Sequence, residues 1–427
     1  MQILVLFGAV LALVLFDIPI AIALGIVAVV ALLATQGPAM LPNVAITMYN
    51  GATSFPLIAI PLFILSGAIM NASGISRRLI AFASAVLGWI RGGLAMVSIG
   101  TSMFFAEISG SAVADVAALG TILIPAMRGR GYSKEFAASV ISSSATLAVI
   151  IPPSIPMLLY AVIAGTSVVK LFVSGIVPGI IGGLGMMAVA YWFARRYDFP
   201  VEQSFRWANV VRTFREALWA FLLPVIILGT IFGGIVTATE GAAMAVLAAL
   251  FVGFVVYREL DAAVLRKSIV DGGVQTAVVM LLVAASALLG VYLTETHLPQ
   301  QLATSILHFT SDKWAVLAIL NVLFLILGFF LHSAAAIILV VPIVMPLVKA
   351  AGIDPVHFGL IVTINLGIGQ QTPPVASVLM TCCAIAKADI WEVTKVNVYF
   401  VAVLLTVLLL VTYVPVVGMG LVDAFYH

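Results

Sequence analysis

The sequence predicts an all-α polytopic membrane protein that contains two copies of one unit. Of its 427 residues, 63% are hydrophobic and only 8% are charged, whereas soluble domains carry roughly 25% charged residues. Several punctuating residues recur at an offset of 221 positions: Pro125 with Pro346, Gly131 with Gly352, Pro152 and Pro153 with Pro373 and Pro374, and Ser133 with Asp354. Such matches without a gap indicate an internal duplication. Duplicated halves with interrupted segments at matching positions are typical of secondary transporters.

The first repeat, residues 1–200, is expected to cross the membrane five times. Its apolar segments are residues 3–16, which lack a small-residue cleavage site, then 18–34, 55–70, 135–163 and 175–193. A re-entrant hairpin at about 92–127 precedes the fourth crossing and breaks at Ser109-Gly110-Ser111. The fourth crossing, about 135–165, is a broken helix because Pro152 and Pro153 interrupt it. The polar residues 201–215 form the predicted cytoplasmic connector.

The second repeat, residues 216–427, has the same plan but starts on the inner side, so the two repeats are predicted to be inverted. Its crossings are residues 221–233, 241–256, 273–293, the broken helix at about 356–387, and 398–414; its hairpin, about 314–348, breaks at His332-Ser333. Ten spans and two hairpins place both termini outside. All 19 lysines and arginines except Lys170, Lys313 and Lys349 then lie inside, as the positive-inside rule requires.

Two shorter apolar runs, Leu79–Ile90 and Leu298–Phe309, are too short to cross comfortably. We interpret both as arm helices that brace a moving part, roughly 92–165 with 314–387, against a static frame. Ordinary interfacial helices are the alternative. Thr237 and Glu240 have the spacing of a capping box that opens the next helix.

Four interrupted elements are expected to meet near the membrane midplane, because inversion brings equivalent breaks together. They are the tip at 107–112, the loop at 142–153, the tip at 332–334 and the loop at 367–374. Unwound backbone at this depth must be satisfied by protein or by a water-filled cavity. Helix amino ends suit an anion, whereas free carbonyl and hydroxyl oxygens suit a small hard cation such as sodium. An anion site beside sodium is the physical expectation.

These same segments resemble a known family. The runs FFAEISGSAVADVAALGTILIPAM (104–127), ATLAVIIPPSIPMLLYA (145–161), GGIVTATEGAA (233–243) and GQQTPPVA (369–376) resemble the large permease subunit of tripartite ATP-independent periplasmic (TRAP) transporters, the DctM type. The resemblance covers essentially the whole chain. It implies an ion-transporter-like elevator fold in a bacterial or archaeal cytoplasmic (inner) membrane. It also implies sodium-coupled uptake of an organic acid such as sialic acid or a dicarboxylate, a small membrane subunit of the DctQ type, and a periplasmic substrate-binding protein of the DctP type.

The family pattern assigns site residues to this chain. It implies a first sodium site at Ser109, Ser111, Ser144 and Thr146, and a second at Ser333, Gly367, Gly369 and Thr372. The implied substrate contacts are Ser109, Gly110, Ser111, Pro153, His332, Gln370 and Gln371. The alternative is that these hydroxyl side chains only cap broken helices.

Two ionisable residues near the tips have open roles. Asp115 lies one turn beyond Ser111, and a carboxylate at that depth is a candidate coupling residue or ion ligand, or else it bonds to nearby backbone amides. His332 replaces the small residues of the first tip. It either faces the cavity, where it would contact an anion or sense pH, or bonds to protein only.

Other functions compete with that of a TRAP permease. An organic-anion/cation symporter that works without a binding protein is the main alternative, and a channel is a nearer rival than an enzyme. An intramembrane enzyme is remote because the chain lacks HExxH, GxSxG and a paired aspartate motif. The formal charge of +2 is uninformative about an acidic partner, and no nucleic-acid partner is expected. The apolar composition makes lipid the expected surroundings.

Overall fold

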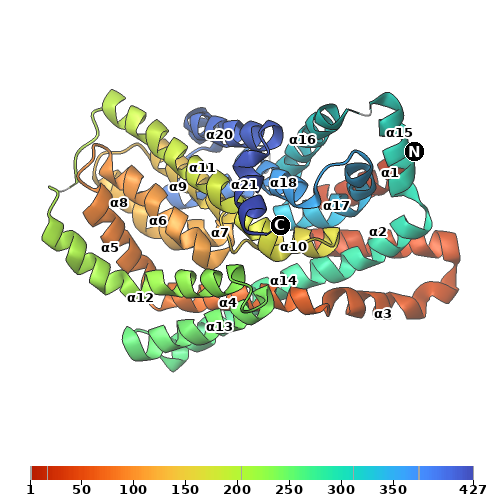
Figure 1. Cartoon of the computed structure of the whole chain (residues 1–427), viewed down its shortest axis with the longest axis horizontal. Helices are drawn as coiled ribbons and strands as arrows, with labels where there is room; N and C mark the ends of the chain where they lie inside the picture. The colour runs from red at the N-terminus through yellow and green to blue at the C-terminus, as the bar shows by residue number, and fades with distance from the viewer. Residues whose placement is uncertain (1, 17, 203, 311, 374–375, 427) are drawn as a thin grey trace.

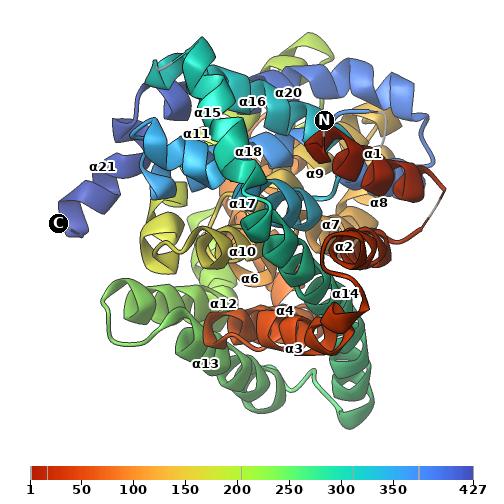
Figure 2. The same cartoon turned by 90° about the vertical axis from the view of Figure 1, so that its right-hand side faces the viewer.

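The structure is a computed structural model that describes residues 2–16, 18–202, 204–310, 312–373 and 376–426. Within these ranges the chain is helical and contains no strand, which confirms the predicted all-α fold class. Nine helices of the described chain are long and apolar enough to cross a membrane. Figures 1 and 2 show α3, α4, α12 and α13 along one side of the molecule and α16 and α20 along the opposite side.

The helices of the first half follow one another with short connections. They are α1 (Gln2–Leu15), α2 (Ile20–Gln36), α3 (Leu41–Ala52), α4 (Ala59–Ala72), α5 (Ile75–Leu87), α6 (Gly93–Ser109), α7 (Ala112–Asp115), α8 (Thr121–Gly129), α9 (Lys134–Ala145), α10 (Ile155–Ala164) and α11 (Val168–Arg196). Short turns add η1 (Pro38–Met40), η2 (Phe55–Ile58), the π-helical η3 (Val116–Gly120) and η4 (Thr146–Val149). The first predicted hairpin is α6 with α7, η3 and α8, and the first broken helix is α9 with α10.

The second half repeats this order. It contains α12 (Trp207–Phe232), α13 (Ala238–Phe251), the π-helical η5 (Val252–Val256), α14 (Ala262–Glu295), α15 (Leu298–Phe309), α16 (Lys313–Phe330), α17 (Ser333–Ala350), α18 (Pro355–Gly369), α19 (Ser377–Ala386), α20 (Ile390–Tyr413) and α21 (Val416–Phe425). The second hairpin is α16 with α17, and the second broken helix is α18 with α19. The capping box at Thr237 and Glu240 is present at the start of α13.

Equivalent positions of the two halves use the same local chemistry. The Ser133 hydroxyl accepts a hydrogen bond from the amide of Phe136 at the start of α9. Asp354, 221 positions later, accepts from the amide of Val356 at the start of α18 (2.7 Å). Two residues before each cap stands a glycine in the left-handed region: Gly131 with φ +86° and Gly352 with φ +67°. Such caps stop one helix and start the next at a fixed angle, so the two halves make this turn in the same way.

The packing divides the helices into a frame and a hairpin body. In the frame, the 34-residue α14 packs against α2, α3 and α4, while α13 packs against α4 and α12. In the body, α9 packs against α6, α19 and α20, and α18 packs against α16. Helix α11 contacts α6, α18 and α20. Helices α11 and α20 therefore pack against the hairpin body, and the predicted division into moving and static parts stays a prediction.

The two arm helices lie between these groups. Helix α5 packs against α6 on one side and α12 on the other, and α15 packs against α17 and α14. Glu259, just before α14, holds the amino end of α5, because it pairs with Arg77 and with Arg78 (2.8 Å). The Arg78 guanidinium also lies 3.7 Å from the centre of the Tyr257 ring, which adds a cation–π attraction.

Three segments differ from the sequence expectation. Helix α3 was not predicted, nor was the short terminal helix α21. Helix α12 begins at Trp207, so residues 207–215 of the predicted connector are helical. The chain just before α12 folds back on the start of the first hairpin. The amide of Gly92 donates to the carbonyl of Pro200, and the amide of Glu202 donates to the carbonyl of Gly88 (3.0 Å).

Candidate substrate and cation site

The first hairpin tip lies directly against the first broken helix. The chain turns at Gly110, whose φ of +59° is the left-handed conformation that glycine adopts without strain. The amide of Ile155 donates to the Gly110 carbonyl at 3.4 Å. A methyl group at Gly110 would lie 2.8 Å from the Pro153 carbonyl oxygen. Gly110 and Pro153, both predicted to contact substrate, are therefore neighbours.

The polar residues of the first tip differ in depth. Ser111 is half-buried and extended, and its carbonyl accepts from the amide of Asp115 (3.0 Å) one helical turn away. Asp115 is completely buried where α7 passes into the π turn η3. Such π turns occur frequently at functional sites. The side chain of Ser109 lies outside the described residues, so its predicted contacts with sodium and substrate stay predictions.

The end of α9 forms a row of buried hydroxyl groups. Ser142, Ser143, Ser144 and Thr146 are all fully buried. The hydroxyl of Ser144 lies 2.9 Å from that of Ser102 on α6. A buried hydroxyl pair of this kind fixes two helices against each other, because an unmade hydrogen bond in the interior is costly. The first hairpin is thus attached to the first broken helix through Ser144.

Gln371 joins the two halves. Its side-chain amide donates to the carbonyl of Ser142 (2.8 Å) and to the hydroxyl of Thr146. The Ser142 hydroxyl in turn donates to the side-chain carbonyl oxygen of Gln371. Asn397 on α20 donates to the Gln371 main-chain carbonyl (3.2 Å). In this conformation Gln371 bonds to protein on every side, so its predicted contact with substrate requires another conformation.

The second tip and the second loop also meet. The side-chain amide of Gln370 donates to the hydroxyl of Ser333, and both residues are buried. His332, immediately before α17, is exposed. Thr372, half-buried, donates to the carbonyl of Ile368 at 3.0 Å. Whether His332 faces a cavity or bonds to protein stays a prediction.

Glycines let the two predicted cation sites approach each other. A methyl group at Gly367 would lie 2.9 Å from the methyl carbon of Thr146, so the second loop packs directly on the first. One at Gly369 would lie 2.7 Å from the carbonyl oxygen of Gly328 on α16, and closer still to its Cα. The residues assigned to separate sodium sites therefore share one compact region of the molecule.

Sequence reasoning missed a buried amide network in the second half. Asn365 on α18 donates to the side-chain oxygen of Asn321 on α16 (2.7 Å), and Asn321 donates to the hydroxyl of Thr412 on α20 (3.1 Å). Asn365 is 221 positions after Ser144, so one member of the network stands at the position equivalent to Ser144. Amides inside apolar helices were the available signal.

The oxygen atoms of this region fit a hard monovalent cation better than a transition metal. Among the described residues, no group of three or more histidine, cysteine, aspartate or glutamate side chains could hold a metal ion. The side-chain oxygen of Asn365 is buried and has no hydrogen-bond partner in the described part of the chain. The hydroxyl oxygen of Thr101 on α6 is in the same situation. Such atoms are available as neutral oxygen ligands.

Comparison with known proteins agrees with this architecture. A sequence model of the family described as tripartite ATP-independent periplasmic transporter, DctM component, matches residues 7–417. The crystal structure of the YdaH transporter from Alcanivorax borkumensis is similar with a TM-score of 0.65, covering 91% of this chain and 90% of that one. At 14% identity this likeness concerns the fold alone.

Relatives extend over nearly the whole chain. The isethionate TRAP transporter permease protein DctMQ of Oleidesulfovibrio alaskensis is 42% identical over 97% of this chain. The matched region spans 65% of the length of that relative. The C4-dicarboxylate TRAP transporter large permease protein DctM of Vibrio cholerae is 37% identical over 97% of this chain and 96% of its own. The chain therefore belongs to the family of DctM components of tripartite ATP-independent periplasmic transporters.

Proposed function

We propose that this chain is the large membrane subunit of a sodium-coupled TRAP transporter that imports an organic acid. A periplasmic protein of the DctP type would deliver the acid, and a small subunit of the DctQ type would complete the membrane part. The names of relatives support an anionic substrate, since they specify isethionate, C4-dicarboxylates, 2,3-diketo-L-gulonate and sialic acid. The carrying observation is the direct contact between broken elements of the two halves, through Gln371 with Ser142 and Thr146.

Sodium is proposed to bind where these elements meet. Carbonyls freed at the helix breaks and the hydroxyls of Ser111, Ser144 and Thr146 would hold one ion. The second would be held by Ser333, Thr372 and carbonyls near Gly367 and Gly369. Neutral oxygen ligands leave most of the ion's charge uncompensated, which favours an anionic substrate close by. Sodium and the organic acid would then bind together, as symport requires.

An elevator movement fits the packing described above. The hairpin body, with α11 and α20, would slide against the frame of α2, α3, α4, α13 and α14. Helices α5 and α15 contact both groups, so they are placed to act as arms. The pairing of Arg77 and Arg78 with Glu259 would anchor α5 to the frame during the movement.

Sodium binding is tested by the thermal midpoint of the purified chain in sodium compared with potassium or choline at equal ionic strength. Linkage predicts about 1 to 2 kcal/mol of stabilisation when sodium exceeds its dissociation constant severalfold. Ser111→Ala should reduce this shift, whereas Ser305→Ala, on the surface of α15, should retain it. No sodium-specific shift in the wild-type chain would contradict sodium coupling.

The proposed orientation has its own test. Single cysteines replacing Arg206 and Lys313 should react with impermeant reagents from opposite sides of the membrane. The native cysteines, Cys382 and Cys383, are both buried, so their background labelling should be low. Labelling of both introduced cysteines from the same side would overturn the predicted topology.

A further inference from the structure

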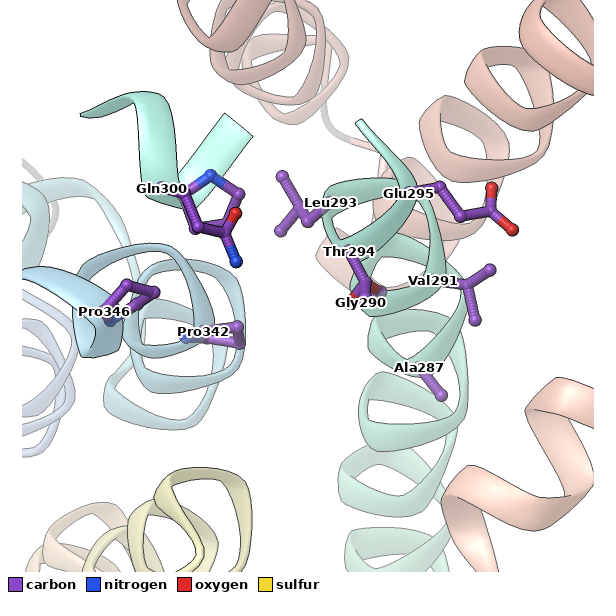
Figure 3. Close-up of a pocket in the computed structure, with 10 residues that line it drawn as sticks. Ala287, Gly290, Val291, Leu293, Thr294, Glu295, Gln300, Pro342 and Pro346 are labelled. Carbon is purple, nitrogen blue, oxygen red and sulfur yellow. The ribbon is translucent and has the colours of Figure 1, made fainter. Parts of the chain in front are cut away.

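Two cavities lie along α14, one near each end. The first, of about 520 Å³, lies between the last turns of α14, the start of α15 and α17. Figure 3 shows Pro342 and Pro346 of α17 on one side of it and Leu293 and Thr294 of α14 on the other. The second, of about 490 Å³, lies between α4, the first turns of α14 and the first hairpin. Each cavity separates a hairpin from the frame.

Only the second of these two cavities extends to a hairpin tip. Phe105 and Ala114 line it, and they stand on either side of the break between α6 and α7. The first cavity is lined on the hairpin side by Pro342 and Pro346. Since α17 begins at Ser333, Pro342 lies about 13 Å along the helix from the second tip. Of these two cavities, only the second therefore lies within reach of a molecule at the first tip.

The frame side of the second cavity is polar. Lys267, Asp271 and Gln275 line it from α14 at intervals of four residues, which places them on one helix face. They extend over about 12 Å of the helix axis, and all three are exposed. Lysine four residues before an acidic residue is the less favourable order for an ion pair. Within the described chain neither Lys267 nor Asp271 forms one, so both charges are available to a ligand.

The opposite wall carries no charge among its described residues. The first hairpin contributes Phe105, Ala114 and Ala117, and α4 adds Asn71 and small or aliphatic residues. Lys267 and Asp271 are the only charged side chains among the described residues that line the cavity. A charged side chain that faces a cavity within a membrane protein is a functional candidate. The static helix therefore supplies the ionic contacts, while the hairpin supplies a smooth apolar surface.

We propose that this cavity is a second binding station for the transported organic anion, between the first hairpin tip and the inner side. The Lys267 ammonium group binds the carboxylate or sulfonate. The amide of Gln275 donates to a further oxygen of the anion, and the Asp271 carboxylate accepts from a hydroxyl group. This assignment rests on the proposed transport of an organic acid, and it adds residues of α14 to the tips and loops considered above.

The electrostatic part is tested by labelling a cysteine within the cavity. Ala117→Cys places a thiol on the exposed hairpin wall. Its reaction rates with an anionic and a cationic methanethiosulfonate reagent of similar size give a ratio that reports the local charge. Lys267→Gln should lower the anionic-to-cationic ratio by about threefold, as removal of one charge at short range across water requires. Asp271→Asn should raise it.

Arg266→Gln is the matched control. Arg266 is the neighbouring basic residue of α14 and is exposed, but it does not line the cavity. It should change the ratio much less than Lys267→Gln. Equal effects of the two substitutions, or an Ala117→Cys thiol that no reagent reaches, would overturn the assignment.

Uptake measurements separate this inference from the proposed function. In vesicles that contain the complete transporter, with isethionate and succinate as probes, Lys267→Gln should raise KM more than it lowers kcat. Arg266→Gln should leave both nearly unchanged. Sodium-driven uptake with an unaltered KM in Lys267→Gln refutes the second station only. Absence of organic-anion uptake in the wild type, with labelling as expected, refutes the proposed function and the assignment of an organic anion together.

Discussion

The contact between Gly328 and Gly369 offers a graded test of how α16 and α18 are held together. A methyl group at Gly369 would lie 2.7 Å from the Gly328 carbonyl oxygen, whereas one at Gly328 would lie 3.0 Å from the Gly369 Cα. Carbon atoms pack best at about 3.5 to 4.0 Å. Both alanines therefore push the two backbones apart, and the one at position 369 does so further because its neighbours are nearer.

The expected magnitudes follow from these distances. Extra carbon atoms in a packed interior typically cost about 1 to 3 kcal/mol. We expect Gly369→Ala to destabilise the chain by an amount at or above the upper end of this range, and Gly328→Ala by an amount near the lower end. Gly273, in the middle of α14, has open space where a methyl group would stand. Gly273→Ala should therefore stabilise the chain by up to about 1 kcal/mol, through helix propensity alone.

Thermal midpoints of the three variants, purified in one detergent, give the comparison. The order of stability should be Gly273→Ala, wild type, Gly328→Ala and Gly369→Ala. Because Gly369 is the last residue of α18 before the second loop, its variant should also show a smaller sodium-dependent shift. A Gly369→Ala chain as stable as the wild type, or more stable than Gly328→Ala, would refute the close approach of the helices.

Two further substitutions test polar groups inside the protein. Burial raises the pKa of the Glu202 carboxyl, and the Arg130 cation lowers it by less. The stability of the wild type relative to Glu202→Gln should therefore be greatest below the unfolded-state pKa of about 4.5 and decline as pH rises from there through the raised folded-state pKa, which thermal midpoints up to about pH 7.5 can show. A relative stability that rises with pH would contradict this sign. Asn365→Leu removes the donor to the buried side-chain oxygen of Asn321. The free energy of unfolding, measured with denaturant, should fall by about 1 to 3 kcal/mol. An unchanged denaturation midpoint would show that the amide network contributes nothing to stability.

Proline, glycine and capping residues made much of the fold predictable. Each of these residues acts through its own backbone, so its effect does not depend on distant partners. Ser133 and Asp354 cap helices in the structure, as their positions after left-handed glycines suggest. The second arm was predicted at Leu298–Phe309, which are the bounds of α15. Local signals of this kind survive in any tertiary context.

Helix α3 shows where local signals were insufficient. Its sequence, LPNVAITMYNGA, mixes apolar and polar residues and is too short and too polar for a membrane span. In the structure it packs along α14, and Gly51 fits against Ala287 because it lacks a side chain. The helix is therefore stabilised by a surface more than 200 residues away in the sequence, which periodicity cannot reveal.

The helix breaks were predictable from the sequence, but the contacts between them were not. The helix breaks identified the tips and loops, yet Gln371 bonds to Ser142 and Thr146 of the other half. A single sequence contains no information on such pairings. The polar face of α14 was missed for a different reason. Lys267 was interpreted only as a marker of the inner side, since the positive-inside rule already explained it.

The duplication gives experiments on this protein an internal control. Each position in the first hairpin and first broken helix has a predicted counterpart 221 residues later in the same molecule, under identical expression, detergent and lipid conditions. Ser144 and Asn365 are such a pair, with hydroxyl chemistry in one half and amide chemistry in the other. Exchanging the two, as Ser144→Asn with Asn365→Ser, asks whether the halves are interchangeable. Unequal effects of the single exchanges would measure how far the two predicted repeats differ in their requirements at this position.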